Sequence, residues 1–441
     1  MNHKLANFVC ILLLLLSYSL FGEASPVATA PGTVPRAVAT GSSLHAIANR
    51  SKSQTKREKK PKEKPQSMTS HVILISIDGL RIEDLDNPKI NIPTLKALRE
   101  RGAFALNVES IYPTQNLPAH ATMVTGMFPS DHGITSDYHF DEQAGITAPE
   151  KRFSGSELKT DSIWQAAKRA GLKTATINSP ITEKAEVDFN SQEINSAAEF
   201  IEKNRPNLTL VYFDDFLAAP EKFDALLKQI INSVERAGIT NETTFLIVSG
   251  HGYAKVEQEF RPNLVLAKKG FLTTNKNGEI NSWIAVAQSF GGSAAIYLKD
   301  EQNEQAIKSL AEIFEEIHET EGSPITRVIS RKALSRLGSN PRAAIFIEAA
   351  PGFIFSEKAT GKKPIEKLTD KADRSASGYL PSRYEMRGAL IAAGKGIKPK
   401  TQIEYAQLVD IAPTIARLLG LELKASRGHI ISEILIQQKQ K

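Results

Sequence analysis

Acidic and histidine side chains follow three apolar runs of the chain, where they could bind a metal ion or a phosphate. The runs and the residues after them are Val72–Ile77 with Asp78, Leu208–Phe213 with Asp214 and Asp215, and Thr243–Ser249 with Gly250 and His251. Continuous apolar runs of this length are typical of strands buried on both faces of a parallel sheet. Ligands of such sheets bind at the carboxyl ends of the strands. The pattern therefore predicts a metal or phosphate site at one sheet edge, although a strand-end Asp can also cap a turn.

Helix-like segments alternate with strand-like runs through residues 71–441. Apolar residues at helical spacing mark 92–102, 162–171, 221–237 and 410–419, and further strand-like runs lie at 173–177 and 389–393. The alternation predicts an α/β fold, with a mostly parallel central sheet covered by helices on both faces. Residues 255–375 fit this alternation poorly, and we predict that they form an inserted subdomain.

The first 70 residues differ in composition from the rest. Lys4 followed by the apolar stretch Phe8–Phe21 and small residues near Ala24 predicts a signal peptide over 1–24, and hence a secreted or periplasmic protein. Cleavage would remove Cys10, the single cysteine. Residues 25–70 are rich in Pro, Ala, Ser, Thr and Lys, which predicts a disordered basic linker.

The basic charge of the chain is concentrated in that linker. The 441 residues carry a net charge of +6, and residues 31–70 hold nine basic and two acidic residues, so the remainder is at −1. The globular part thus has no nucleic-acid footprint, and no run after the signal is apolar enough to cross a bilayer. The tail could contact an anionic surface, or it could be a solvated spacer.

Four segments resemble the alkaline-phosphatase superfamily, and most closely its type I phosphodiesterase/nucleotide pyrophosphatase family. They are Ile75-Ser-Ile-Asp-Gly-Leu-Arg81, Tyr112 to Ile134 with Pro113-Thr-Gln-Asn-Leu-Pro118, Ile247-Val-Ser-Gly-His-Gly252 and Val409 to Gly420. The resemblance implies an alkaline-phosphatase-like fold and two zinc ions about 4 Å apart that clamp a phosphoryl group. It also implies a Thr or Ser nucleophile at a helix N-terminus, where free N–H groups favour the anion.

The resemblance assigns seven core positions, and four of them have lost the group that the family uses. The metal ligands that remain are Asp78, Asp215 and His251; the substituted positions are Asn116 for the nucleophile, Ala219 and Ser377 for His, and Gly250 for Asp. An amide cannot form a phosphoryl ester, and neither zinc site keeps the three protein ligands of a catalytic site. Thr114 matches a non-nucleophilic Thr of the family, and Asp137 matches a phosphate-contacting Asn.

These substitutions favour a pseudo-hydrolase that binds a ligand or a protein partner, with no metal or one weakly held metal. The alternative is an active hydrolase of phosphate mono- or diesters with a rearranged site. It would use a water or Thr114 as nucleophile, and one metal held by Asp78, His251 and a recruited Asp137, Asp214 or His139. Adhesion to an anionic surface through residues 50–64 is a third possibility.

Overall fold

The computed structural model describes residues 66–181, 187–189, 194–214, 216–369 and 374–437. The predicted signal peptide and the linker up to residue 65 lie outside the described residues, so both remain predictions.

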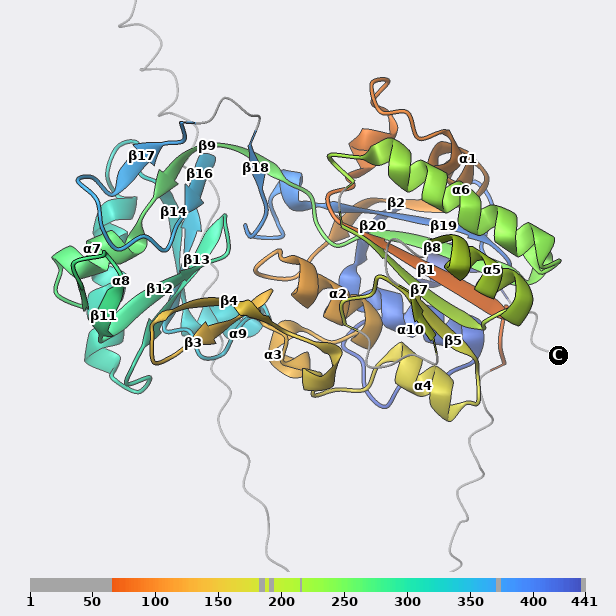
Figure 1. Cartoon of the computed structure of the whole chain (residues 1–441), viewed down its shortest axis with the longest axis horizontal. Helices are drawn as coiled ribbons and strands as arrows, with labels where there is room; N and C mark the ends of the chain where they lie inside the picture. The colour runs from red at the N-terminus through yellow and green to blue at the C-terminus, as the bar shows by residue number, and fades with distance from the viewer. Residues whose placement is uncertain (1–65, 182–186, 190–193, 215, 370–373, 438–441) are drawn as a thin grey trace, which may run out of the picture. The chain divides into compact units, whose positions relative to one another are not determined.

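The central sheet has eight strands, and the three apolar runs form its middle (Figure 1). In spatial order the strands are β20 (Thr401–Gln407), β2 (Ala103–Glu109), β19 (Gly388–Gly394), β8 (Thr243–Ser249), β1 (His71–Ile77), β7 (Leu208–Phe213), β5 (Thr174–Ile177) and β6 (Val187–Phe189). Only β19 runs antiparallel to its neighbours β2 and β8. Strands β1 and β8 are buried at every residue, as continuous apolar runs require in a sheet covered on both faces.

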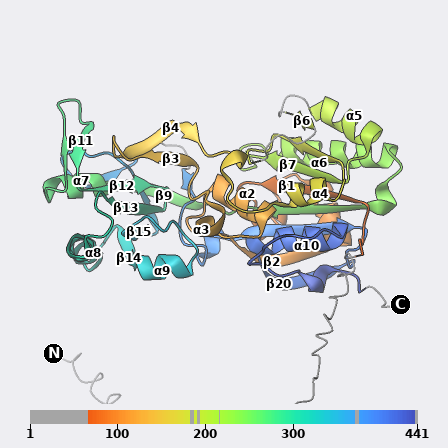
Figure 2. The same cartoon turned by 90° about the horizontal axis from the view of Figure 1, so that it is seen from below.

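Helices cover both faces of this sheet (Figures 1 and 2). On one face lie α1 (Pro93–Arg101), α5 (Ile194–Asn204) and α6 (Pro220–Arg236), and on the other α2 (Asn116–Thr125), α4 (Ile163–Arg169) and α10 (Ile411–Leu419). Each face has its own apolar core, because successive strand residues point to opposite sides. Ser162 begins α4 with a capping box, in which its hydroxyl and the Gln165 side chain each bond the other residue's backbone N–H. The predicted α/β fold class is confirmed.

Residues 254–369 and 374–376 form further sheets with a third apolar core. One is antiparallel, in the order β12 (Ala285–Ser289), β13 (Ser293–Leu298), β15 (Ile345–Ala349) and β14 (Ile325–Ser330). Another gathers β16 (Gly352–Phe355), β17 (Ile365–Lys367) and β18 (Ser375–Ala376) around β9 (Ala254–Phe260). The remaining elements of this region are α7 (Pro262–Lys268), β10 (Leu272–Thr274), β11 (Ile280–Trp283), α8 (Glu304–His318) and α9 (Arg331–Arg336).

Between α2 and α4 the chain forms α3 (Pro129–His132) and a hairpin of β3 (Tyr138–Asp141) and β4 (Ile146–Arg152). The hairpin begins directly after Asp137, the position matched to a phosphate contact. It also contacts β12 of the second region.

Candidate active site

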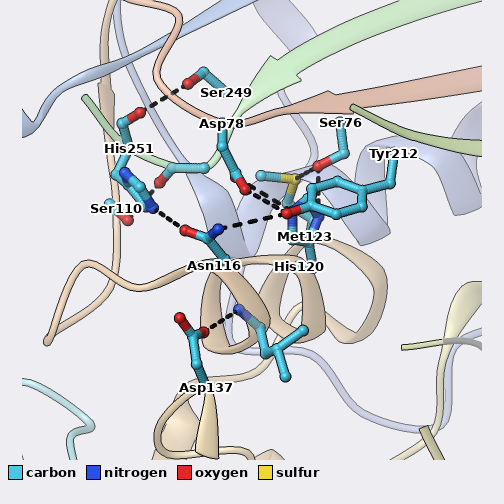
Figure 3. A network of polar contacts seen from close by, with 12 residues as sticks. Ser76, Asp78, Ser110, Asn116, His120, Met123, Asp137, Tyr212, Ser249 and His251 are labelled. Carbon is cyan, nitrogen blue, oxygen red and sulfur yellow. Dashed lines mark hydrogen bonds and ion pairs between the residues drawn. The ribbon is translucent and has the colours of Figure 1, made fainter. Parts of the chain in front are cut away.

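The carboxyl ends of β1 and β8 bring Asp78 and His251 together, beside Tyr212 of β7 (Figure 3). The strand ladder continues past the strands, since Asp78 N–H donates to the Phe213 carbonyl at 3.1 Å and Gly250 N–H to the Ile77 carbonyl at 3.0 Å. Asp78 and His251 are both fully buried there. Asn116 joins them as the first residue of α2.

Tyr212, the penultimate residue of β7, connects these groups. Its hydroxyl donates a short hydrogen bond to Asp78 Oδ2. Asn116 Nδ2 lies 3.4 Å from the same hydroxyl, and Asn116 Oδ1 lies 2.7 Å from His251 Nε2. The retained Asp78 and His251 are therefore bridged by two side chains, Tyr212 and Asn116, with no gap in the hydrogen-bond chain. Tyr212 was not predicted as a site residue, because a tyrosine inside an apolar run has the sequence pattern of a core residue.

The second nitrogen of His251, Nδ1, lies 3.0 Å from the Gly252 carbonyl. With the Asn116 amide in this orientation, each ring nitrogen of His251 faces an oxygen atom. The ring can donate to both only as an imidazolium, whereas a rotated Asn116 amide would serve a neutral ring. In either arrangement both nitrogens are engaged by the protein.

The other oxygen of Asp78, Oδ1, faces His120 Nε2 at 3.4 Å, and neither atom has a hydrogen bond within the described residues. His120 is held by Ser76, whose Oγ lies 2.6 Å from Nδ1. Burial alone would raise the pKa of Asp78, but the contact with His120, the charges of His120 and His251 and the Tyr212 hydroxyl together hold this pKa below its ordinary value. Asp78 is therefore an ionised, buried carboxylate.

Asp137, which the resemblance matches to a phosphate-contacting residue, lies at the N-terminus of α2. Its Oδ1 accepts a 2.7 Å hydrogen bond from Leu117 N–H, one of the free donors of the first turn. Burial raises the pKa of Asp137, the Leu117 N–H opposes this, and the charge of Asp78 raises the pKa further. The Asp137 carboxyl group thus satisfies a helix N–H donor that could otherwise attract an anion.

Thr114, the alternative nucleophile, is fully buried. Its hydroxyl donates to the Tyr379 carbonyl at 3.1 Å and accepts from Gly378 N–H at 2.8 Å. These two bonds give Thr114 a structural role in joining two loops. A hydroxyl so engaged is a poor candidate for attack on a substrate.

The substituted positions lack metal donors in the structure as well. Ala219 directly precedes α6, and Ser377 is half-buried and offers its carbonyl to Gly292 N–H at 2.8 Å. A Cβ on Gly250 would lie 3.1 Å from the Ala119 Cβ and 3.5 Å from Asp78 Oδ1, so the neighbouring residues leave little room for a side chain. Asp215 lies outside the described residues.

Of the three residues that an alternative site could recruit, Asp137 is near enough to Asp78 and His251 for both to affect its pKa. His139 pairs with Glu157 at 2.8 Å and stacks on Phe153, and Asp214 is exposed. Across the described part of the chain, no three His, Cys, Asp or Glu side chains lie close enough to hold a metal ion. The donor set that the structure describes does not fit two zinc ions.

The fold and the motif positions together define an alkaline-phosphatase-like protein. The chain belongs to the type I phosphodiesterase/nucleotide pyrophosphatase family, whose sequence model matches residues 72–380. Human ectonucleotide pyrophosphatase/phosphodiesterase family member 1 is 24% identical over 190 residues, which is 38% of this chain and 20% of that protein. Venom phosphodiesterase of Naja atra is 25% identical over 193 residues, which is 39% of this chain and 23% of the venom protein. The aligned part is thus under a quarter of the length of either relative.

Solved structures extend the similarity in fold over more of the chain. Human ectonucleotide pyrophosphatase/phosphodiesterase 5 superposes with a TM-score of 0.66 at 20% identity, covering 83% of this chain and all of that one. The murine protein gives 0.64 at 18% identity. At this identity the superposition establishes the fold alone.

Proposed function

We propose that this protein is a family member that no longer hydrolyses phosphodiesters by the two-zinc mechanism and that acts by binding. The observation that carries the proposal is the bridge from Asp78 through Tyr212 and Asn116 to His251. Asp78 Oδ2 and His251 Nε2 each have a side-chain partner in this bridge, so two of the atoms that a metal ion would use are already engaged. The Asn at the nucleophile position and the carboxylate of Asp137 on α2 support the same conclusion.

The proposed setting is outside the cytoplasm. The matched relatives include ectonucleotide enzymes and venom phosphodiesterases, and the first 24 residues have the pattern of a signal peptide. Within the described residues, no helix has the length and apolarity needed to cross a membrane. We expect a ligand in the old cleft or a protein partner, and either no metal or one weakly held metal.

The alternative is a hydrolase with one metal held by Asp78, His251 and a recruited acid. Two observations favour this alternative. Asp78 is ionised, and His251 lies at the same carboxyl edge of the sheet as Asp78. It would require Tyr212 and Asn116 to release both groups, and a water nucleophile, since Thr114 is engaged.

The deciding experiment measures zinc content and turnover of a nitrophenyl phosphodiester by the purified full chain, with an active venom phosphodiesterase as positive control. We expect less than one zinc ion per chain after dialysis. With zinc added, turnover of the substrate should not exceed the rate in buffer alone. Two tightly bound zinc ions with ordinary turnover would overturn the proposal. One bound metal with slow turnover abolished by His251→Ala would establish the alternative.

A further inference from the structure

A pocket separate from the candidate active site lies between the hairpin β3–β4 and the second region. Its lining comes from three parts of the chain: α3 with the loop after it, the hairpin with the segment that follows it, and the second region. The pocket has a volume of about 360 Å³, which is in the range of small-molecule sites and far above the ~30 Å³ of one water. None of its lining residues belongs to the candidate active site.

Three polar side chains of the lining are buried and form one chain of hydrogen bonds. Asn340 Nδ2 donates to the Tyr297 hydroxyl at 2.9 Å, and this hydroxyl donates to Gln288 Oε1 at 3.0 Å. Gln288 Nε2 continues the chain to Thr147 Oγ1 of β4 at 3.2 Å. Burial raises the pKa of Tyr297, so its hydroxyl stays neutral. This part of the pocket therefore presents fixed, uncharged hydrogen-bonding groups.

The two amides of this chain keep donors for a ligand. An amide nitrogen carries two hydrogens. Within the described residues, Asn340 Nδ2 and Gln288 Nε2 each have one acceptor, so one N–H of each remains. Ser130 and Thr135 add two hydroxyl groups to the lining. These groups match a ligand that is rich in hydroxyl oxygens.

Aromatic rings lie beside these polar groups in the same lining. The rings of His139 and Phe153 stack with centroids 3.8 Å apart and an interplanar angle of 22°. Phe140 lies 4.6 Å from the Tyr297 ring. A sugar ring has a face of C–H groups, which packs on an aromatic surface, and a rim of hydroxyls, which bonds to amides. The pocket offers both kinds of surface together.

The charges of the lining are held in ion pairs. His139 Nε2 lies 2.8 Å from Glu157, and Arg342 contacts Glu142 at 2.5 Å and Glu301 at 3.0 Å. An anionic ligand such as a phosphate would compete with two carboxylates for Arg342.

Lys159, the other cation of the lining, is exposed, so solvent and salt screen its ammonium group. The pocket is therefore suited to an uncharged ligand.

We propose that this pocket binds a neutral saccharide unit, with its C–H face on the His139–Phe153 pair and its hydroxyls on the amides of Gln288 and Asn340. The proposal goes beyond the function inferred above. It adds a second binding site, and it holds whether the candidate active site binds a ligand or hydrolyses one.

Saturation-transfer difference NMR on the full chain tests the proposal. The probes are four neutral sugars (glucose, galactose, mannose and N-acetylglucosamine), with glucuronate as a charged sugar and adenosine as a planar nucleoside. We expect saturation of the C–H protons of at least one neutral sugar. Binding of none of the four would overturn the proposal, whether or not glucuronate or adenosine binds.

Two exposed serines give a matched pair of variants that locate the sugar. Ser130→Trp places a bulky ring in the lining and should abolish the signal, whereas Ser335→Trp on α9 lies outside the lining and should keep it. Equal sugar signals in the two variants would overturn the assignment to this pocket.

His139→Ala removes one ring of the stacked pair and should weaken the affinity for the sugar about two- to ten-fold. This variant decides the question if Ser130→Trp fails to fold. An unchanged affinity in His139→Ala would show that the sugar does not use this aromatic surface, which would overturn the proposal.

Discussion

At the scale of single residues, Tyr212 supplies a hydrogen bond to the buried Asp78 carboxylate. Asp78 is almost completely enclosed, and burial alone would favour its neutral form. The tyrosine hydroxyl and the neighbouring histidines keep it ionised. A single hydroxyl at a strand end therefore has consequences for charge as well as for packing.

Removing that hydroxyl should destabilise the fold. Tyr212→Phe takes a donor from Asp78 and an acceptor from Asn116, and a buried charged acceptor without its donor costs about 1–3 kcal/mol. Denaturant unfolding should show this as a lower midpoint at unchanged slope. Tyr405→Phe, at a half-exposed tyrosine that bonds Glu109, is the control and should shift the free energy of unfolding by less than about 0.5 kcal/mol. An unchanged free energy of unfolding in Tyr212→Phe would show that the bridge contributes nothing to stability.

Asp137→Asn should change the pH dependence of stability. Because the pKa of Asp137 is raised on folding, its contribution is full at low pH and is lost as the pH rises through the folded value. An asparagine can still accept from Leu117 N–H and cannot ionise. The free energy of unfolding of Asp137→Asn minus that of the wild type should therefore be larger at pH 7 than at pH 3.5. A constant difference across this range would contradict the assignment.

At the scale of elements, the N-terminus of α2 lies at the position that the resemblance assigns to the nucleophile, and the proposed function gives it a structural role. It still begins at the residue matched to the nucleophile, directly beside the carboxyl ends of β1 and β8. Its first free N–H donor now points at Asp137, which the chain places there through the start of the hairpin β3–β4. The helix N-terminus is bonded to a carboxyl group of the same chain.

Restoring the lost groups should restore metal binding if the residue mapping is right. The variant combines Asn116→Thr, Ala219→His, Gly250→Asp and Ser377→His, with Ala119→Gly added because a side chain at Gly250 would press on the Ala119 Cβ. We expect at least one zinc per chain by elemental analysis, against less than one in the wild type and in Ala119→Gly alone. A folded variant that binds no zinc would show that the mapping is wrong.

The sequence was most informative for the buried strands. The runs 208–213 and 243–249 match β7 and β8 to the residue, since strands buried on both faces are apolar throughout. Strand β2, which reads Ala-Phe-Ala-Leu-Asn-Val-Glu and is only partly buried, was not predicted. Among site residues, Asp78, Asn116, Asp137 and His251 were placed by motif. The role of Tyr212 and the buried state of Thr114 depend on contacts between distant segments, which spacing along the chain does not encode.

At the scale of the whole molecule, the excess positive charge lies in the N-terminal tail and the remainder of the chain is close to neutral. A polybasic segment binds anionic lipid through screened electrostatics, and its attraction weakens as salt shortens the Debye length. Adhesion through residues 50–64 can therefore be tested independently of the function of the candidate active site.

If the tail is adhesive, a peptide of residues 25–64 should sediment with vesicles that contain phosphatidylserine. The fraction of peptide bound should then fall steeply as the salt concentration rises. The chain from residue 66 onwards should stay in the supernatant under the same conditions. A solvated spacer would give no sedimentation of the peptide on anionic or neutral vesicles. Neutral phosphatidylcholine vesicles control for apolar adsorption.

The antiparallel strand β19 has a consequence for how the chain matures. It lies between β2 and β8 and is the link that joins the pair β20–β2 to the other five strands, yet its residues, 388–394, come after nearly nine tenths of the chain. Until they are made, β2 and β8 each present a bare backbone edge, of the kind that pairs with other chains. Synthesis in order from the N-terminus cannot close this sheet early. The nascent chain would need protection from self-association, and a chain that stops before Gly388 should aggregate instead of yielding a smaller folded domain.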